Sequence, residues 1–552
     1  MTKRTYHIIF LLLLSSSLAL SQKIINCDLI IENDDLYITN YTASPGDTLC
    51  LMAGNRPHLY LRDIMGAQDT PVVLINHQGI SNIESFEPYG IRFANSRFIK
   101  ITGTGSNAEY GIQIDTVSIG DGIDINSLSS DVEIDHIKIQ NIKYAGIKVK
   151  TDPNCTFRAV RDSFTLYNVH IHDNYLSNIG TEGLYIGSSF FLGQYISDCD
   201  TSVLPHLIDG VRIYRNKLNH IGWDGIQVGS ALNACEIYDN EINHDSFDEH
   251  YHQMSGIMVN PGSRCDVYNN QIINGKGTGI INQGAGGQFI YNNLIVNAGR
   301  DYYMDDQVSK QQFGIFSKYQ YIHPEDSSYY IFNNTIINPK SDGIRYFNKY
   351  SKSNLIINNI IINPGAFDFY ETNGSLNNEG VDSYIHNYLH ESDLILANNL
   401  KERNASLQHF EDTLMHDYHL TWRSPAHNSG YNLSDYHISF DLDRNTRPYD
   451  NYFDIGAYEL QSAENIEEVN ENNIHIIPNP VKNKFILQID ENTNHSYKLN
   501  IYSVYGAIIL SRNIRVSSGI SDFIDLNDLS SGFYFVEIEN KDSRFVKRFL
   551  KR

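Results

Sequence analysis

The feature that most constrains this chain is a short apolar pattern that ends in asparagine and recurs eight times. Its last residues are Asn174, Asn216, Asn240, Asn270, Asn293, Asn334, Asn359 and Asn399. A glycine-led pattern follows four of them after nine residues each, at Gly183, Gly225, Gly279 and Gly343. The shortest intervals between asparagines are 24, 23 and 25 residues (216 to 240, 270 to 293, 334 to 359). Because apolar residues alternate with period two, these intervals predict a solenoid of short parallel strands, one turn per repeat.

Each repeated residue type has an expected role in such a turn. Alternation directs Ile226 and Val228 inward and Gln227 outward. A stacked asparagine can bond its amide to the copy about 4.8 Å away in the next turn. The repeated glycine is expected at a bend that requires a positive φ.

The repeats between about residues 111 and 400 resemble the pectin-lyase-like right-handed parallel β-helix, and that resemblance implies the handedness. A solenoid also accommodates 552 residues, because each turn packs only on its neighbours. We expect 22–110 to form an N-terminal cap with the first strands. The segments Ser424–Gly430 and Phe453–Glu459 resemble the end of bacterial β-helix proteins, so 401–460 is expected to form a C-terminal cap in which Arg444 and carboxylates hold the last loop.

The N-terminus predicts export. Lys3 and Arg4 precede an apolar run and a small-residue cleavage site, which indicates a signal peptide over 1–21. We expect no transmembrane span in the mature chain. The cysteines therefore meet an oxidising compartment. Cys235 and Cys265 occupy one slot in successive turns, within disulfide range, and either a disulfide or a stack of two buried thiols fits that spacing.

The C-terminal region differs in composition from the repeats. Residues 461–473 are acidic and polar, as in a linker. The strand motifs of 474–552 and their basic end resemble the sorting domain of cargo of the Bacteroidetes type IX secretion system. The resemblance implies a small β-sandwich, transport by that machinery to the outer-membrane surface or medium, and removal of the domain. An ordinary β-sandwich binding module is the alternative.

Insertions interrupt the repeat at about 151–166, 188–208, 244–253, 300–312 and 317–328. The first two follow equivalent strands in adjacent turns, so we expect them on one rim of the solenoid, with 244–253 on the other. Long loops on a rigid scaffold are where function usually lies. The net charge of −23 argues against a nucleic-acid partner.

The candidate site lies between these insertions. One outward slot holds Lys148, Tyr185, Gln227 and Met258 in successive turns, and Glu182, Asp224, Ser255 and Thr278 stand just before the strands. The residues expected to contact substrate around them are Lys150, Asp152, Trp223, Gln227, His250 and His252. A row of polar and aromatic side chains suits an extended polysaccharide.

Two chemistries fit these residues. Glu182 and Asp224 are placed to act as paired carboxylates in glycoside hydrolysis. Alternatively, Lys148 or Tyr185 removes the proton α to a uronate carboxyl while Lys150 stabilises the enolate, as in a polysaccharide lyase. The local run of Lys138, Lys143, Lys148, Lys150, Arg158 and Arg161 favours an anionic substrate.

Structural roles compete with both chemistries. The two carboxylates also suit a cap on the bend, and the histidines suit a solvated loop or ligands of substrate or metal. The sequence identifies no cofactor and leaves a calcium requirement open. We expect a secreted β-helix protein that binds and degrades a polysaccharide; the alternative is a non-catalytic adhesin or glycan-binding protein.

Overall fold

The computed structural model describes residues 25–552 except 303–310, 319–326, 349, 366–382, 388–391, 462–473, 490–494, 504–507, 528 and 540–543. The expected signal peptide and nearly all of the expected linker lie outside the described residues. The described residues form strands and short 3₁₀-helices, with no α-helix among them. The chain divides into two compact units, Met1–Leu460 and Gln461–Arg552.

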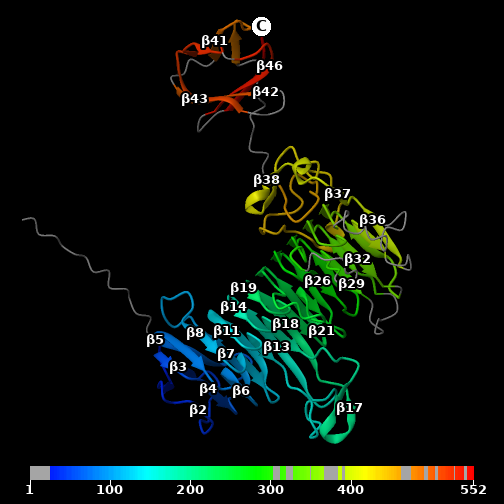
Figure 1. Ribbon diagram of the computed structural model, residues 1–552. Coiled ribbons are helices and arrows are strands. Elements are labelled where there is room, and N and C mark those ends of the chain that lie inside the picture. Colours follow the sequence, from blue (N-terminus) through cyan, green and yellow to red (C-terminus); the bar gives the residue numbers. More distant parts are fainter. Residues whose placement is uncertain are drawn as a thin grey trace, which may run out of the picture. The chain divides into compact units, whose positions relative to one another are not determined.

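The first unit is a parallel β-helix in which successive turns stack along one axis (Figure 1). One side is a twelve-stranded parallel sheet. Its strands in order are β2 (Tyr37–Ile38), β4 (Leu59–Arg62), β6 (Tyr89–Ala94), β9 (Asp121–Asn126), β12 (Ile147–Val149), β15 (Leu184–Gly187), β20 (Ile226–Gly229), β23 (Ser255–Val259), β26 (Thr278–Asn282), β29 (Ile315–Lys318), β32 (Ile344–Phe347) and β35 (Ile385–Asn387).

The other strands belong to a 23-stranded sheet that bends once in each turn. Before the bend lie β1 (Leu29–Ile31), β3 (Thr48–Arg56), β5 (Val72–Ser85), β7 (Arg97–Thr102), β10 (Ser130–Asp135), β13 (Thr165–His172), β18 (Leu207–Tyr214), β21 (Ala231–Tyr238), β24 (Cys265–Tyr268), β27 (Phe289–Tyr291), β30 (Tyr330–Phe332), β33 (Asn354–Ile357) and β36 (Leu394–Ala397). After it lie β8 (Ile112–Val117), β11 (Ile137–Ile142), β14 (Tyr175–Ile179), β19 (Lys217–Ile221), β22 (Glu241–Asn243), β25 (Gln271–Ile273), β28 (Leu294–Val296), β31 (Thr335–Ile337), β34 (Ile360–Ile362) and β37 (Leu400–Glu402).

Alternating aliphatic side chains fill the interior. Ile226 and Val228 are fully buried, as predicted, and belong to one continuous hydrophobic core that extends from Ile31 to Ile385. The parallel sheets begin well before residue 111, since β1, β3 and β5 already pair in parallel. The early turns lack the repeated asparagine, so the sequence pattern did not reveal them.

The asparagine ladder is confirmed. The eight repeated asparagines bond side chain to side chain in seven consecutive steps, with Nδ2–Oδ1 distances of 2.8–3.0 Å. The residue before each one has a positive φ of 46–60°, which turns the chain at the bend of the large sheet.

The expectation for the repeated glycines is wrong. Gly183, Gly225, Gly279 and Gly343 are not among the glycines with positive φ. A Cβ on Gly225 would instead lie 2.5 Å from the carbonyl oxygen of Gly256 and 2.9 Å from the Cγ2 atom of Ile242. The glycine is therefore required by close packing between turns.

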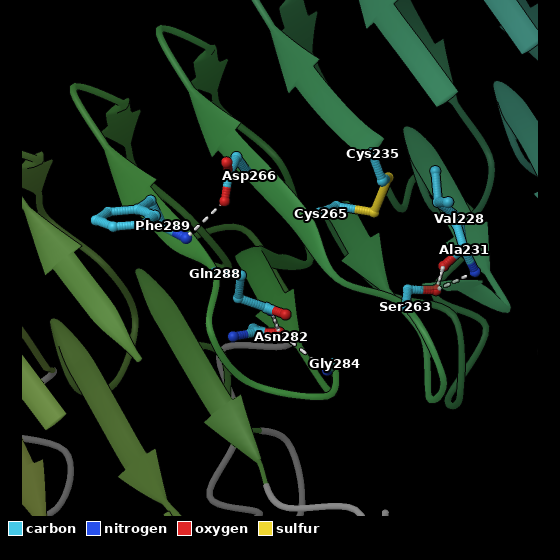
Figure 2. Close-up of a disulfide and its surroundings, with 10 residues drawn as sticks. All are labelled: Val228, Ala231, Cys235, Ser263, Cys265, Asp266, Asn282, Gly284, Gln288 and Phe289. Atoms are coloured by element: carbon cyan, nitrogen blue, oxygen red, sulfur yellow. Dashed lines mark hydrogen bonds between the residues drawn. A yellow bond between two sulfur atoms is a disulfide. The ribbon is translucent and has the colours of Figure 1, made fainter. Parts of the chain in front are cut away.

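Three disulfides join the six cysteines. Cys235 on β21 and Cys265 on β24 form one, across directly paired positions of neighbouring strands (Figure 2). The structure thus has the disulfide rather than the stacked thiols. Cys155–Cys199 joins the first two insertions, which also pair through Val160 and Pro205 and therefore lie on one rim, as predicted. The second insertion contains the hairpin β16 (Gln194–Ile196) and β17 (Thr201–Val203).

Residues after β37 form the C-terminal cap. It contains 3₁₀-helices η4 (Ala405–Gln408), η5 (Thr413–Met415) and η6 (Ser434–Tyr436) and the hairpin β38 (Phe410–Asp412) and β39 (Asp417–Leu420). Residues 429–456, here called the strap, run back along the bend of the large sheet. Arg444 pairs with Asp239 of the helix, as expected of a residue that holds this loop.

The second unit is an antiparallel sheet in the order β40-β41-β44-β43-β42-β46-β47, with β45 beside β41. The strands are β40 (Ile474–Ile477), β41 (Lys484–Ile489), β42 (His495–Ser503), β43 (Ile508–Ser517), β44 (Ile520–Ser521), β45 (Ile524–Asp525), β46 (Gly532–Glu539) and β47 (Arg544–Lys551). A bridge between Val481 and Lys551 brings its two ends together around a separate core.

Candidate functional site

One outward-facing row of side chains runs along the twelve-stranded sheet. The register of the parallel strands aligns Lys148 with Tyr185, Gln227 and Met258 in successive turns, as the sequence predicted. The row continues in both directions, through Arg92 and Asp124 on one side and through Ile281, Phe316, Arg345 and His386 on the other. Its character changes along its length, from ionic near Lys148 to apolar at Met258, Ile281 and Phe316, and back to ionic at Arg345 and His386, which both pair with Asp342.

Lys148 is held between two carboxylates. Its ammonium pairs with Asp121 and lies 3.5 Å from Asp124, which also pairs with Arg92 at 2.7 Å. Burial lowers the pKa of Lys148, but the two carboxylates outweigh burial, so the pKa is raised above its ordinary value. At neutral pH Lys148 is therefore a fixed cation, suited to binding an anion and unsuited to removing a proton.

Tyr185 lies directly beside Lys148 and is half-buried. Its hydroxyl is 3.2 Å from the Lys150 Nζ atom, which donates to it, and 3.3 Å from the Ser189 hydroxyl. The Lys150 ammonium also lies 4.4 Å from the centre of the Tyr185 ring and 2.7 Å from the Asp152 carboxylate. Burial lowers the pKa of Lys150, but Tyr185 and Asp152 outweigh it, so this pKa is raised and the group stays charged.

Glu182 and Asp224 are brought together, but beneath the surface. Glu182 is 3% exposed, Asp224 is 0% and Gln227, which lies between them, is 2%. With its amide nitrogen facing the carboxylates, Gln227 donates to Asp224 at 3.3 Å and to Glu182 at 3.2 Å and accepts from Asn260. The outward position of Gln227 is thus covered.

The buried carboxylates resist ionisation. Burial raises the pKa of Glu182, and burial together with the nearby Glu182 raises the pKa of Asp224 well above its ordinary value. Among the described residues, neither carboxylate has an ion-pair partner. Asp224 accepts a hydrogen bond from the Ser255 hydroxyl in the next turn at 2.7 Å. This contact gives Asp224 a structural role in joining two neighbouring turns.

The insertion 244–253 lies against Trp223, which stands just before β20. The His250 ring stacks on Trp223 at 4.1 Å, and Asp245 is fully buried at the base of the insertion. Burial raises the pKa of Asp245 to about 6. His252, which is exposed, lines a pocket further along the row together with Tyr251. Of the residues expected to contact substrate, Trp223 is therefore partly covered, whereas His250 and His252 remain at the surface.

The pocket beyond Gln227 has a volume of about 320 Å³. Met258, Ile281 and Phe316 from three neighbouring strands form its floor. Side chains from the segments that precede and follow these strands form its walls. The sequence analysis included only Met258 of this floor. Alternation along β26 and β29 predicts that Ile281 and Phe316 face outward. The pattern does not indicate which of the outward-facing residues in a long row line a pocket.

Two groups of described residues have metal-ligand geometry: Cys27, Cys50 and His77, and Glu133, Asp135 and His172. The two cysteines of the first group form a disulfide. In the second, Lys100 pairs with both carboxylates and supplies the positive charge. Neither group fits a metal ion as it stands, and the expectation about calcium stays open.

Comparison with known families assigns both units. Residues 206–399 match the right handed beta helix region family, and residues 475–552 match the secretion system C-terminal sorting domain. The chain is a right-handed parallel β-helix protein with a C-terminal sorting domain. That domain directs it through type IX secretion to the cell surface or the extracellular space. In the described part of the chain, no helix is long and apolar enough to cross a membrane.

No curated protein sequence matches the chain. Similar solved structures include pectate lyase Pel9A, with 11% identity and a TM-score of 0.34 over 79% of this chain and 97% of that one. A GH136 lacto-N-biosidase from Eubacterium ramulus has 10% identity and a TM-score of 0.38 over 65% and 63%. A PL6 family polysaccharide lyase from Pseudopedobacter saltans has 14% identity and a TM-score of 0.25 over 66% and 92%. These values do not assign an activity.

Proposed function

We propose that this secreted protein binds an anionic polysaccharide on the outer face of the twelve-stranded sheet and cleaves it by β-elimination at Tyr185. The observation that carries the proposal is the setting of the Tyr185 hydroxyl, held by Lys150 and Ser189 beside the cation Lys148. Because Lys150 donates to the phenolic oxygen, that oxygen keeps a partner whether or not it carries its proton.

The two lysines give the site its preference for negative charge. Lys148 and Lys150 remain protonated and are paired with Asp121, Asp124 and Asp152, so a substrate carboxylate would share these two ammonium groups with the aspartates. A uronate carboxylate beside Lys148 would receive a charge-assisted hydrogen bond, which is stronger than one between neutral groups. A neutral glycan gains no such contact.

The elimination step uses these groups in fixed roles. The Tyr185 oxygen, in its deprotonated form, takes the proton from the carbon α to the uronate carboxyl, and the negative charge moves onto the carboxylate oxygens near Lys148 and Lys150. The electron pair then forms a carbon–carbon double bond as the bond to the glycosidic oxygen breaks. Tyr185 then returns the proton it has taken to that oxygen, so the products are an unsaturated uronate end and a new hydroxyl end, and Tyr185 is restored to its starting form.

Hydrolysis by Glu182 and Asp224 is the weaker proposal. A pair of catalytic carboxylates must reach the glycosidic oxygen and a water molecule or the sugar carbon. These two are almost fully buried and share the amide of Gln227. Burial alone raises the pKa of a structural carboxylate, so the raised pKa values of Glu182 and Asp224 do not indicate a catalytic role.

The test is a panel of uronate-containing and neutral glycans, with formation of the unsaturated product followed by ultraviolet absorbance and new reducing ends measured in parallel. Tyr185→Phe keeps the aromatic ring beneath the Lys150 ammonium but removes the hydroxyl, so it should lower the elimination rate by about 10²-fold or more. Lys148→Met should mainly weaken binding. Tyr195→Phe is the matched control, because Tyr195 is an exposed tyrosine whose hydroxyl bonds only Asp200 among the hydrogen bonds of the structure.

Each result has a defined meaning. New reducing ends without the unsaturated product, abolished by Glu182→Gln, would establish hydrolysis. Binding without any cleavage, lost in Lys148→Met, would establish a glycan-binding protein. Full activity of Tyr185→Phe would contradict the assignment of Tyr185.

A further inference from the structure

We propose that the pocket over Met258, Ile281 and Phe316 binds an uncharged sugar unit of the same glycan, so that the substrate is a heteropolysaccharide that combines uronate with neutral sugars. The inference rests on the proposed function, because it extends the same groove. It concerns residues to which the elimination step assigns no role.

The pocket continues the row that contains Tyr185. From Tyr185 the register passes through Gln227, Met258 and Ile281 to Phe316, which is four strand steps. At about 4.8 Å per step, the far end of the pocket floor lies about 19 Å from Tyr185 along the sheet. An extended glycan chain of a few sugar units is long enough to reach both places by passing over the covered Gln227.

The two ends of this part of the row differ in polarity. Near Tyr185 lie Lys148, which is paired with Asp121 and Asp124, and the buried Lys150, which is paired with Asp152. The pocket floor is formed by a thioether, an aliphatic and an aromatic side chain, and among its lining residues Lys318, an exposed residue, is the single lysine or arginine. A carboxylate placed on this apolar floor would lose water, which is costly, and the guanidinium of Arg345, which follows Phe316 in the row, is already paired with Asp342. The pocket thus favours a neutral unit.

The lining also suits a sugar ring. Phe316 is partly exposed and packs against the buried Phe313 at 5.0 Å, so the Phe316 ring offers an aromatic surface for the apolar C–H face of a sugar ring. The walls carry the hydrogen-bonding side chains of Gln283, Gln311 and Gln312. A volume of about 320 Å³ is within the range of small-molecule sites.

The experiment uses an oligosaccharide array with three classes: uronate only, uronate alternating with a neutral sugar, and neutral only. The best member of each class is then titrated calorimetrically against wild type, Phe316→Ala and Lys148→Met. We expect the alternating class to bind most tightly, with a loss of about tenfold or more in Phe316→Ala. Uronate-only binding should be unchanged in Phe316→Ala and lost in Lys148→Met.

Controls separate this inference from the proposed function. Phe86→Ala removes a phenylalanine that is 81% exposed and does not line the pocket, and thermal melting verifies folding of each variant. Ile281→Ser is the second variant if Phe316→Ala fails to fold. If glycans of the alternating class bind through Lys148 and their affinity is unchanged in Phe316→Ala and Ile281→Ser, the proposal for the pocket alone is overturned. Neutral glycans that bind through Phe316 without Lys148 overturn the anionic substrate alone, and absence of binding to every class overturns both.

Discussion

At the scale of single residues, the two asparagines of the Asn-Asn pairs have different roles. The second of each pair forms the internal ladder. The first has a positive φ and donates its side-chain amide to a strap carbonyl, as Asn292 does to Phe440 at 2.6 Å. The same contact occurs at Asn269, Asn333, Asn358 and Asn398. In the earlier turns this position holds Asp173, Arg215 and Asp239, and of these Asp239 contacts the strap through an ion pair with Arg444.

Asn292→Gly should therefore destabilise the β-helix. The carbonyl oxygen of the Asn292 side chain accepts from Arg447 at 2.7 Å, and Arg447 is almost fully buried. Glycine tolerates the positive φ but leaves one guanidinium nitrogen without this partner, at a cost of about 1–3 kcal/mol. The midpoint of urea unfolding should fall. Asn178→Gly is the control, since Asn178 is exposed and has a similar φ; an equal effect there would contradict a role for the strap contact.

The buried carboxylates give a prediction about pH. The pKa of Asp224 is raised in the folded protein, so wild type loses stability as pH rises from the ordinary aspartate value of 3.8 through the raised value. Asp224→Asn has no proton to lose, so it gains no buried charge as pH rises, and its side-chain oxygen still accepts a hydrogen bond from the Ser255 hydroxyl. Its unfolding midpoint should exceed that of wild type at pH 8, and the difference should disappear toward pH 4. Greater stability of wild type at pH 8 would show that the ionised carboxylate has a partner.

Sequence reasoning reached the site only in part, for a physical reason. Strand register follows from the period of the repeat, so the row of Lys148, Tyr185 and Gln227 was predictable. Exposure depends also on what lies above the row. Gln227 and Asp224 are buried among polar neighbours from adjoining turns, such as Glu182 and Asn260, and the alternation pattern does not show that these side chains cover one another.

At the scale of elements, the disulfides stabilise two different kinds of structure. Cys235–Cys265 joins neighbouring strands within the hydrophobic core, and Cys155–Cys199 joins two surface insertions. The second insertion also carries Ser189, which contacts the Tyr185 hydroxyl. The same bond type is therefore expected to have different consequences in the two places.

Replacement of each pair by serine tests this difference. Loss of Cys235–Cys265 should lower the free energy of unfolding by about 2–4 kcal/mol, and buried serine hydroxyls should add to the loss. Loss of Cys155–Cys199 should leave the unfolding midpoint nearly unchanged but speed proteolytic cleavage within 188–208. Mass spectrometry of the fragments locates the cleavage. A large fall in the midpoint for the second pair would show that the insertions support the core.

At the scale of the whole molecule, the fold was more predictable than the site. Repeats specify a solenoid because every turn meets the same neighbour, so a single register fixes many strands at once. The limits of the solenoid were harder to predict. The early turns through β6 lack the asparagine ladder and were expected only as a cap with the first strands, and they pair in parallel like the rest.

The division into two units leads to the last prediction, that a chain ending at Leu460 folds as the full chain does. Each unit has its own hydrophobic core, and the buried residues of the β-helix core and of the sorting-domain core form separate clusters. Arg447 and Glu459, which close the cap with a buried 2.8 Å ion pair, both lie before the truncation. The truncated protein should therefore keep the thermal midpoint of the β-helix, while losing the sorting domain should abolish its export in the native host. Fractionation of cells and medium measures export, and calorimetry measures the midpoint. A truncated protein that still reaches the surface would contradict the role of residues 475–552, whereas a lowered midpoint would show that the β-helix depends on the second unit.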